Sequence, residues 1–203
     1  MGIMKVGESS AGSKIVAIAS STGGPKALQS LIPKLPANLD APILIVQHMP
    51  AGFTEALAGR LDSLGEISVK EAAEGDVLLK GHVYLSKGGR HMNIRKMSGK
   101  QTIHYTDEPP REGVRPCANY MYESLADSSY DEVICVVLTG MGADGTEGIR
   151  NLKKNKKVTV IAQNEETCIV YGMPRSVSIA GLSDKVVPLT QISNEIIKNV
   201  GVI

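Results

Sequence analysis

The sequence has 203 residues, a length that predicts a single domain whose core needs no disulfide and no structural metal. Its 22 Lys and Arg balance 21 Asp and Glu, so the net charge of +1 excludes a global field that attracts nucleic acid or anionic membranes. Only 3% of the residues are aromatic, which argues against a platform on which nucleic-acid bases could stack.

The chain begins with residues 1–13, which are small, polar and aperiodic. We expect them to be a flexible remnant of a linker or a cloning scar, and we expect one folded domain over residues 14–203. A short apolar run at 14–19 predicts a buried strand, and the Gly-rich turn at 20–25 leads into a helix.

The same order of strand, loop and helix then recurs along the chain. Residues 42–47 predict a second strand, and the helix after it is expected to bury Phe53, Leu57, Leu61 and Leu64 on one face. Further strands are predicted at 133–139 and 158–163, the first followed by a Gly-rich loop and a helix, and a last helix at 190–200.

Between residues 67 and 105 the pattern changes to short alternating runs, which predict an antiparallel meander or hairpin. These runs are 82–86, 92–95 and 102–105. Strands that alternate with helices elsewhere predict an α/β fold. We expect a doubly wound, mainly parallel sheet with helices on both faces and an antiparallel hairpin at its edge.

Three loops that follow predicted strands carry residues suited to catalysis, and in such sheets ligands bind at the carboxyl ends of the strands. They supply a hydroxyl from Ser20 or Ser21, an imidazole from His48 and a carboxylate from Asp144. Nucleophilic acyl transfer needs these three groups, because a hydroxyl attacks only when a base takes its proton and a carboxylate orients that base.

Other interpretations of these loops remain open at the level of sequence. The serines lie in what is otherwise an ordinary strand-to-helix turn, and Asp144 is a suitable N-cap for the helix after it. Residues 140–145 also match the dinucleotide-binding pattern G-x-G-x-x-G, although no acidic residue is clearly placed for the ribose. The three cysteines have no metal-binding spacing and no apolar run spans a membrane, so we expect a reduced cytoplasmic protein without metal or cofactor.

The segments around these loops resemble the catalytic domain of the CheB family, the chemotaxis response-regulator protein-glutamate methylesterases. They occur in the order of the family and extend over nearly all of residues 14–200. The matching segments are IASSTGGP at 18–25, VQHMPAGFT at 46–54, GHVYL at 81–85, GRHM at 89–92, LTGMGADG at 138–145, AQNE at 162–165 and YGMPR at 171–175.

The resemblance implies that Ser21 is the nucleophile, His48 the base and Asp144 the orienting carboxylate. It places the oxyanion-binding backbone at Thr22 and Met141. It also implies hydrolysis of glutamate γ-methyl esters on methyl-accepting chemoreceptors, with release of methanol and with deamidation of receptor glutamine. An inactive receptor-binding module and a nucleotide-binding enzyme are the alternatives.

The sequence departs from the family pattern at three places. Ser20 stands where the family usually has Ala, and Asn119 stands where it usually has Asp. The family also carries an N-terminal receiver domain, phosphorylated by the chemotaxis histidine kinase, that these 203 residues lack. We therefore expect this chain to be active without a phosphodonor, with the methylesterase catalytic domain at 14–203.

Overall fold

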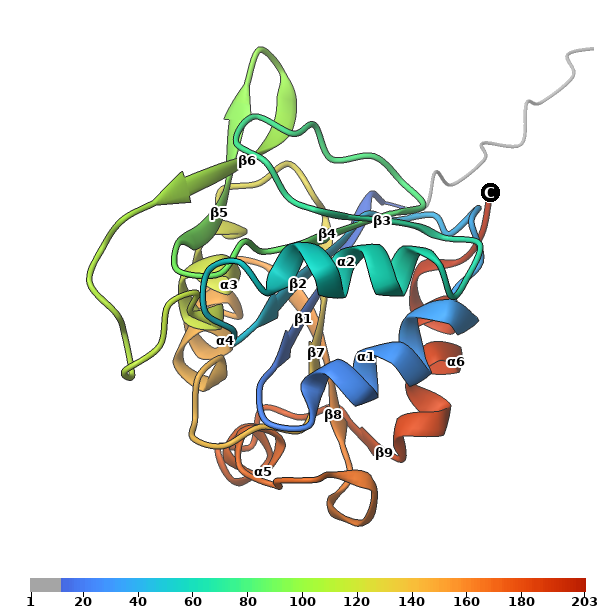
Figure 1. Ribbon diagram of the computed structural model, residues 1–203, viewed down its shortest axis with the longest axis vertical. Helices are drawn as coiled ribbons and strands as arrows, with labels where there is room; N and C mark the ends of the chain where they lie inside the picture. Colours follow the sequence, from blue (N-terminus) through green and yellow to red (C-terminus); the bar gives the residue numbers. More distant parts are fainter. Residues whose placement is uncertain (1–11) are drawn as a thin grey trace, which may run out of the picture.

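A computed structural model describes residues 12–203 of the chain (Figure 1). The linker expected at 1–13 therefore lies outside the described residues except for its last two positions. There, the backbone N–H of Ser13 donates to Asp131 Oδ2 at 2.7 Å, which ties the start of the domain to its body.

Within the described residues, seven strands form one parallel sheet in the order β3-β4-β2-β1-β7-β8-β9. The strands are β1 (Lys14–Ser20), β2 (Ile43–Gln47), β3 (Ser68–Glu71), β4 (His82–Leu85), β7 (Glu132–Val137), β8 (Lys157–Gln163) and β9 (Lys185–Val187). The central strands β1, β2 and β7 are buried along almost their whole length, as expected of strands covered on both faces.

Helices cover both faces of the sheet, which confirms the doubly wound fold (Figure 1). One face packs against α1 (Gly24–Leu31), α2 (Thr54–Asp62) and α6 (Leu189–Val200). The other packs against α3 (Ala118–Ser124), α4 (Thr146–Leu152) and α5 (Met173–Ile179). Two short 3₁₀ helices, η1 (Ile32–Lys34) and η2 (Glu165–Thr167), lie in the connections.

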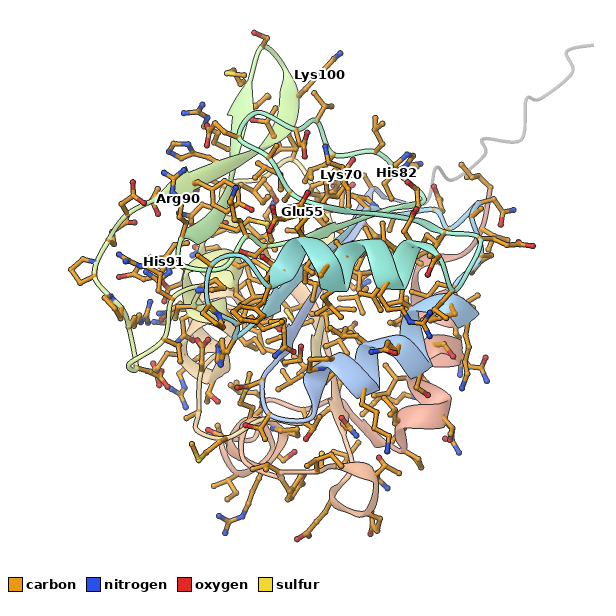
Figure 2. All side chains as sticks on the ribbon, in the orientation of Figure 1. Glu55, Lys70, His82, Arg90, His91 and Lys100 are labelled. Carbon is orange, nitrogen blue, oxygen red and sulfur yellow. The ribbon has the colours of Figure 1, made fainter. Side chains whose placement is uncertain are left out.

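The antiparallel hairpin is present as β5 (His91–Met97) and β6 (Lys100–Thr106), a two-stranded sheet whose strand β6 also forms a single bridge from Thr102 to Val77. Its apolar face packs into the same core as α3, and Figure 2 shows Lys100 at its outer tip and His91 at its opposite end. The assignment of residues 82–86 to this hairpin is wrong. That segment is β4, which lies between β2 and β3 in the parallel sheet, because Val83, Tyr84 and Leu85 are buried there.

The expected apolar face of α2 is also only partly correct. Leu57 and Leu61 are buried, but Phe53 precedes the helix and is 60% exposed, and Leu64 lies in the turn after it. The helix ends because the chain closes a tighter turn, in which the backbone N–H of Leu64 donates to Leu61 O at 3.2 Å.

The strand order places the functional loops together. From β1 the chain moves through β2 toward one edge of the sheet, and from β7 it moves through β8 toward the other edge. The order therefore reverses between β1 and β7, the position where open α/β sheets leave a crevice for ligands. Among residues 12–203, no helix is long and apolar enough to cross a membrane.

Candidate active site

Ser21 lies in a tight turn between β1 and α1. Its N–H donates to Thr139 O at 3.0 Å, and its carbonyl accepts from Gly24 N at 2.7 Å. Gly23 adopts φ 81°, a left-handed conformation that favours glycine and lets the helix begin at once. The side chain of Ser21 is thereby left at the carboxyl end of the sheet, partly exposed.

The two adjacent serines occupy different environments. Ser20 is fully buried, and its hydroxyl donates to Gln47 Oε1 at 2.7 Å. The Gln47 amide in turn donates to the carbonyls of Ser21 at 3.0 Å and His48 at 3.2 Å. Ser20 therefore stabilises the turn, and Ser21 is the serine whose hydroxyl faces accessible space.

His48 follows β2 and is held from both ends. Its backbone N–H donates to Ser20 O at 3.1 Å, and its ring Nε2 lies 2.6 Å from Asp144 Oδ2. Because Nε2 is engaged by the carboxylate, Nδ1 is the nitrogen left to exchange a proton with a nucleophile. Within residues 12–203, the Ser21 hydroxyl makes no hydrogen bond, so the structure brings His48 and Asp144 into contact but does not join Ser21 to them.

Asp144 is 2% exposed, and its carboxylate accepts from four donors. These are His48 Nε2, Cys117 Sγ at 3.0 Å, Ala118 N at 2.6 Å and Asn119 N at 2.9 Å. Burial by itself raises the pKa of this carboxyl, but the hydrogen bonds from His48, Cys117 and Ala118 outweigh burial, so its pKa lies below the usual value. Asp144 is therefore ionised at neutral pH.

Asp144 does not cap the helix that follows it, so that alternative is wrong. The N-cap residue of α4 is Gly145, which has no side chain to cap the helix. The Asp144 carboxylate instead accepts from the first backbone N–H groups of α3. These N–H groups lack partners inside their own helix, and a carboxylate is a favourable acceptor for them.

The loop after β7, where an oxyanion-binding backbone is expected, lies beside Ser21. A Cβ at Gly140 would lie 2.8 Å from Ser21 Cβ, so this loop lies directly against the serine. Within the described part of the chain, the backbone N–H groups of Thr22 and Met141 donate no hydrogen bond. The Met141 side chain is 72% exposed and extends into solvent.

Two hollows flank the site. A groove of about 570 Å³ runs from Gly142 and Ala143 along α4 and α5, with Arg150 and Arg175 on its walls. A shallower hollow of about 220 Å³ is lined by His48, Pro50, Arg115 and their neighbours. Both are open to solvent.

Three further residues shape the site, namely Gln47, Cys117 and Asn119. Sequence reasoning noted Asn119 only as a departure from the family pattern and predicted no contact with the site for any of the three. Gln47 is a polar residue at the end of an otherwise apolar buried strand, which is a visible signal. Cys117 and Asn119 precede and begin α3, which follows no predicted strand. Only their contact with Asp144, more than 20 residues later in the chain, identifies them.

Known proteins are similar to this chain in sequence and in fold. The profile of the CheB methylesterase family matches residues 16–196. The chain is 46% identical over 187 residues to a protein-glutamate methylesterase/protein-glutamine glutaminase of Geobacillus kaustophilus, covering 92% of this chain and 54% of that protein. A relative of the same name from Syntrophomonas wolfei is 46% identical over 188 residues, covering 91% of this chain and 53% of the relative.

The chain thus spans about half the length of the curated relatives it matches. Among solved structures, the crystal structure of the Thermotoga maritima CheB methylesterase catalytic domain is similar with a TM-score of 0.89 and 43% sequence identity. That likeness covers 94% of this chain and 100% of the other. With its sequence, fold and strand-end loops in agreement, the chain belongs to the CheB methylesterase family.

Proposed function

We propose that this chain hydrolyses glutamate γ-methyl esters on the cytoplasmic helices of methyl-accepting chemoreceptors, with release of methanol, during chemotaxis adaptation. The observation that carries the proposal is the 2.6 Å contact between His48 and the buried Asp144 at the strand ends where Ser21 lies. The names of the curated relatives support the same substrate class.

In the first half of the reaction, the Ser21 hydroxyl attacks the ester carbonyl while His48 Nδ1 takes its proton. The imidazole becomes positively charged, and the ionised Asp144 beside Nε2 stabilises that charge and holds the ring in place. The carbonyl oxygen becomes an oxyanion, which the backbone N–H groups of Thr22 and Met141 stabilise.

In the second half, His48 donates its proton to the departing methoxide, and methanol leaves. Ser21 is then esterified to the glutamate side chain. Water attacks this ester with His48 again as the base, and glutamate and free Ser21 are regenerated. Receptor glutamine follows the same route, with ammonia as the leaving group.

We place this reaction in the cytoplasm, with chemoreceptors as partners. In longer members of the family, a receiver domain phosphorylated by the chemotaxis histidine kinase would act on the same site. The mixed charges along the groove beside Met141 offer complementary contacts to a polar receptor helix.

The test is release of labelled methanol from receptor membranes whose glutamates carry labelled methyl esters. The native chain should release methanol, and Ser21→Ala should lose at least about 10³-fold in rate, because one member of a triad is removed. Ser20→Ala is the matched control. Its rate should stay within about tenfold of the native chain, although losing the bond to Gln47 lowers stability by about 1–3 kcal/mol.

Receptor binding by the native chain without methanol release would contradict the proposal and indicate an inactive binding module. Equal losses in the two serine variants, both folded by circular dichroism, would show that Ser21 is not the nucleophile. Saturable binding of NAD at the loop over residues 140–145 would favour the nucleotide-binding alternative.

A further inference from the structure

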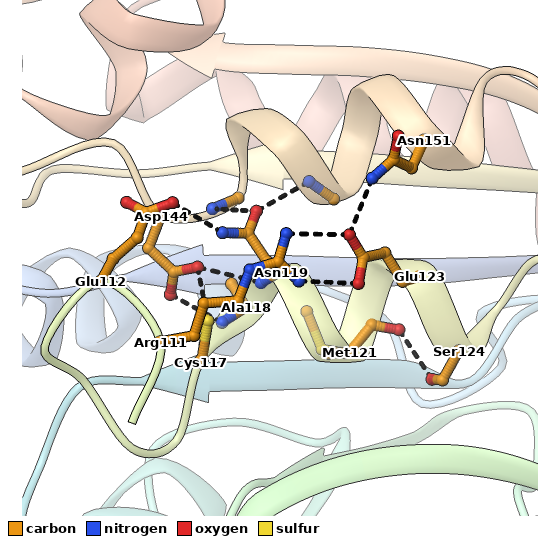
Figure 3. Close-up of polar contacts among 12 residues, drawn as sticks. Arg111, Glu112, Cys117, Ala118, Asn119, Met121, Glu123, Ser124, Asp144 and Asn151 are labelled. Atoms are coloured by element: carbon orange, nitrogen blue, oxygen red, sulfur yellow. Dashed lines mark hydrogen bonds and ion pairs between the residues drawn. The ribbon is translucent and has the colours of Figure 1, made fainter. Parts of the chain in front are cut away.

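The N-termini of α3 and α4 cap one another through side chains exchanged between them (Figure 3). Asp144, just before α4, accepts from the first backbone N–H groups of α3. Asn119, in the first turn of α3, returns the contact. Its Oδ1 accepts from Gly145 N at 3.0 Å and from Gly148 N at 2.7 Å.

This exchange holds Asp144 at two points. Its carboxylate is fixed by the backbone N–H of Asn119, and the peptide that follows it is fixed by the side chain of the same residue. Asn119 is fully buried, so neither contact competes with water. A displacement of Asn119 would therefore move the carboxylate that contacts His48.

The two helices approach so closely that no side chain fits at the glycines of α4 that face α3. A Cβ at Gly148 would lie 2.6 Å from Asn119 Cα and 2.7 Å from its carbonyl oxygen. Gly145 has φ 99°, and a Cβ there would lie 3.1 Å from the ring of Tyr122. The backbone of α4 therefore rests directly on α3 at Asn119.

The Asn119 amide is also held in one orientation. Its Nδ2 donates to Glu112 Oε1 at 2.8 Å, so Oδ1 faces α4. Glu112 lines the groove beside the oxyanion loop, and in Figure 3 it lies on the outer side of Asn119. A neutral amide at this position caps α4 without adding a negative charge between Glu112 and Asp144.

We propose that Asn119 is a positioning residue for the reaction at Ser21, which sets the position and charge environment of Asp144 and through it of His48. This inference rests on the proposed function. It concerns a residue that makes no contact with the reacting atoms and acts only through Asp144.

The expected pH dependence of the reaction also depends on the titratable and charged groups around His48 and Asp144. Cys117 and Tyr122 lie against Asp144 from α3 and its preceding loop, and burial raises the pKa of both, so both stay neutral. Glu123 lies farther along α3 and is paired with Arg111. Glu112 lies beyond Asn119, and Arg115 lines the hollow beside His48.

Asn119→Ala removes the acceptor for Gly145 and Gly148. We expect kcat for methanol release to fall by about tenfold to a hundredfold with KM changed less than about threefold, because a small displacement of a catalytic group costs rate and not substrate binding. A second readout does not depend on activity. The low-field NMR resonance of the proton between His48 and Asp144 should shift or broaden in this variant.

Asn119→Asp is the variant that keeps the cap, since Asp and Asn cap helices about equally well. Its maximal kcat should recover to within about threefold of the native chain. Its added negative charge favours the protonated imidazole, so the acidic limb of the pH profile should move upward by roughly half to one pH unit. A residue that only capped a helix would leave the profile unchanged, and that result would overturn the proposal.

Asn151→Ala is the matched control. Asn151 on α4 also donates a hydrogen bond to α3, at Glu123 Oε1, but within residues 12–203 it forms no hydrogen bond with Asp144 or Asn119. It should lower the melting temperature and leave kcat, pH profile and the low-field resonance unchanged. Native kcat and a native resonance in folded Asn119→Ala would also overturn the proposal. Failure of the proposed function can be distinguished from failure of this inference. In the first case the native chain would release no methanol, while the low-field resonance would still report whether Asn119 positions Asp144.

Discussion

The carboxylate of Asp144 shows how single residues determine the chemistry of this site. A buried, ionised carboxylate is unfavourable unless donors surround it, and here Cys117, two backbone N–H groups and His48 do so. Its charge therefore serves two purposes, since it contacts the imidazole and caps the N-terminus of α3. In the proposed mechanism, the same carboxylate that stabilises the start of α3 also acts in catalysis.

Asp144→Asn should lower kcat by roughly 10⁴-fold, the size of the effect when an orienting carboxylate in a serine-protease triad becomes an amide. The NH₂ group of the introduced amide would also face the backbone N–H donors of α3, so the melting temperature should fall as well. Methanol release and thermal unfolding, measured on the same preparation, separate the two effects. Asp184→Asn is the control, because Asp184 accepts from Val160 N and Lys153 far from the site and should affect stability alone. A folded Asp144→Asn variant within tenfold of native kcat would argue against the assigned role.

At the scale of elements, α3 and α4 approach so closely at Gly148 that no side chain fits there. Gly148→Ala would place a methyl group against the backbone of Asn119, so we expect a loss of about 1–3 kcal/mol in the free energy of unfolding and a lower kcat. Gly59→Ala on α2 is the matched substitution, because nothing lies within 4 Å of its Cβ position. It should stabilise the protein by about 0.5–1 kcal/mol through helix propensity and leave kcat unchanged. Urea unfolding checks both, and equal effects would show that the close approach is unimportant.

At the scale of the whole molecule, Glu132 joins the amino ends of the three neighbouring strands β1, β7 and β8, opposite the carboxyl ends where the candidate active site lies. It is 5% exposed and contacts Thr159 Oγ1 at 2.9 Å, Lys157 Nζ at 3.1 Å and Lys14 Nζ at 3.4 Å. Burial raises the pKa of this carboxyl, but the contacts with Thr159, Lys157 and Lys14 outweigh burial, so its pKa lies below the usual value.

Because the folded-state pKa of Glu132 is lowered, its contribution to stability is complete above the unfolded value, about 4.3, and is lost as pH falls through the folded value. We expect the free energy of unfolding to fall steeply below about pH 4.3. Glu132→Gln should be less stable than the native chain at pH 7 and should approach it at acidic pH, as measured by urea unfolding at several pH values. Glu166→Gln, at an exposed position, should follow the native curve throughout. Parallel curves for the native chain and Glu132→Gln would contradict this assignment.

The sequence by itself determined the local secondary structure and the side chains available in the loops at the strand ends. Apolar runs, Gly-rich turns and helical spacing are local signals, so the strands at 14–20, 43–47 and 132–137 and the α/β class followed from them. The loops that carry the candidate catalytic residues could be brought together from sequence as well, because the carboxyl ends of parallel strands lie at the same end of a sheet.

Tertiary structure decided every feature that depends on contacts between distant segments. Which of Ser20 and Ser21 is buried depends on Gln47, and the cap that Asp144 makes depends on where α3 packs. The segment 82–85 became a parallel strand because two neighbours were available to pair with it, whereas its length and boundaries suited a hairpin equally well. Periodicity and turn residues describe how a segment folds locally, and only packing decides which distant segment it meets.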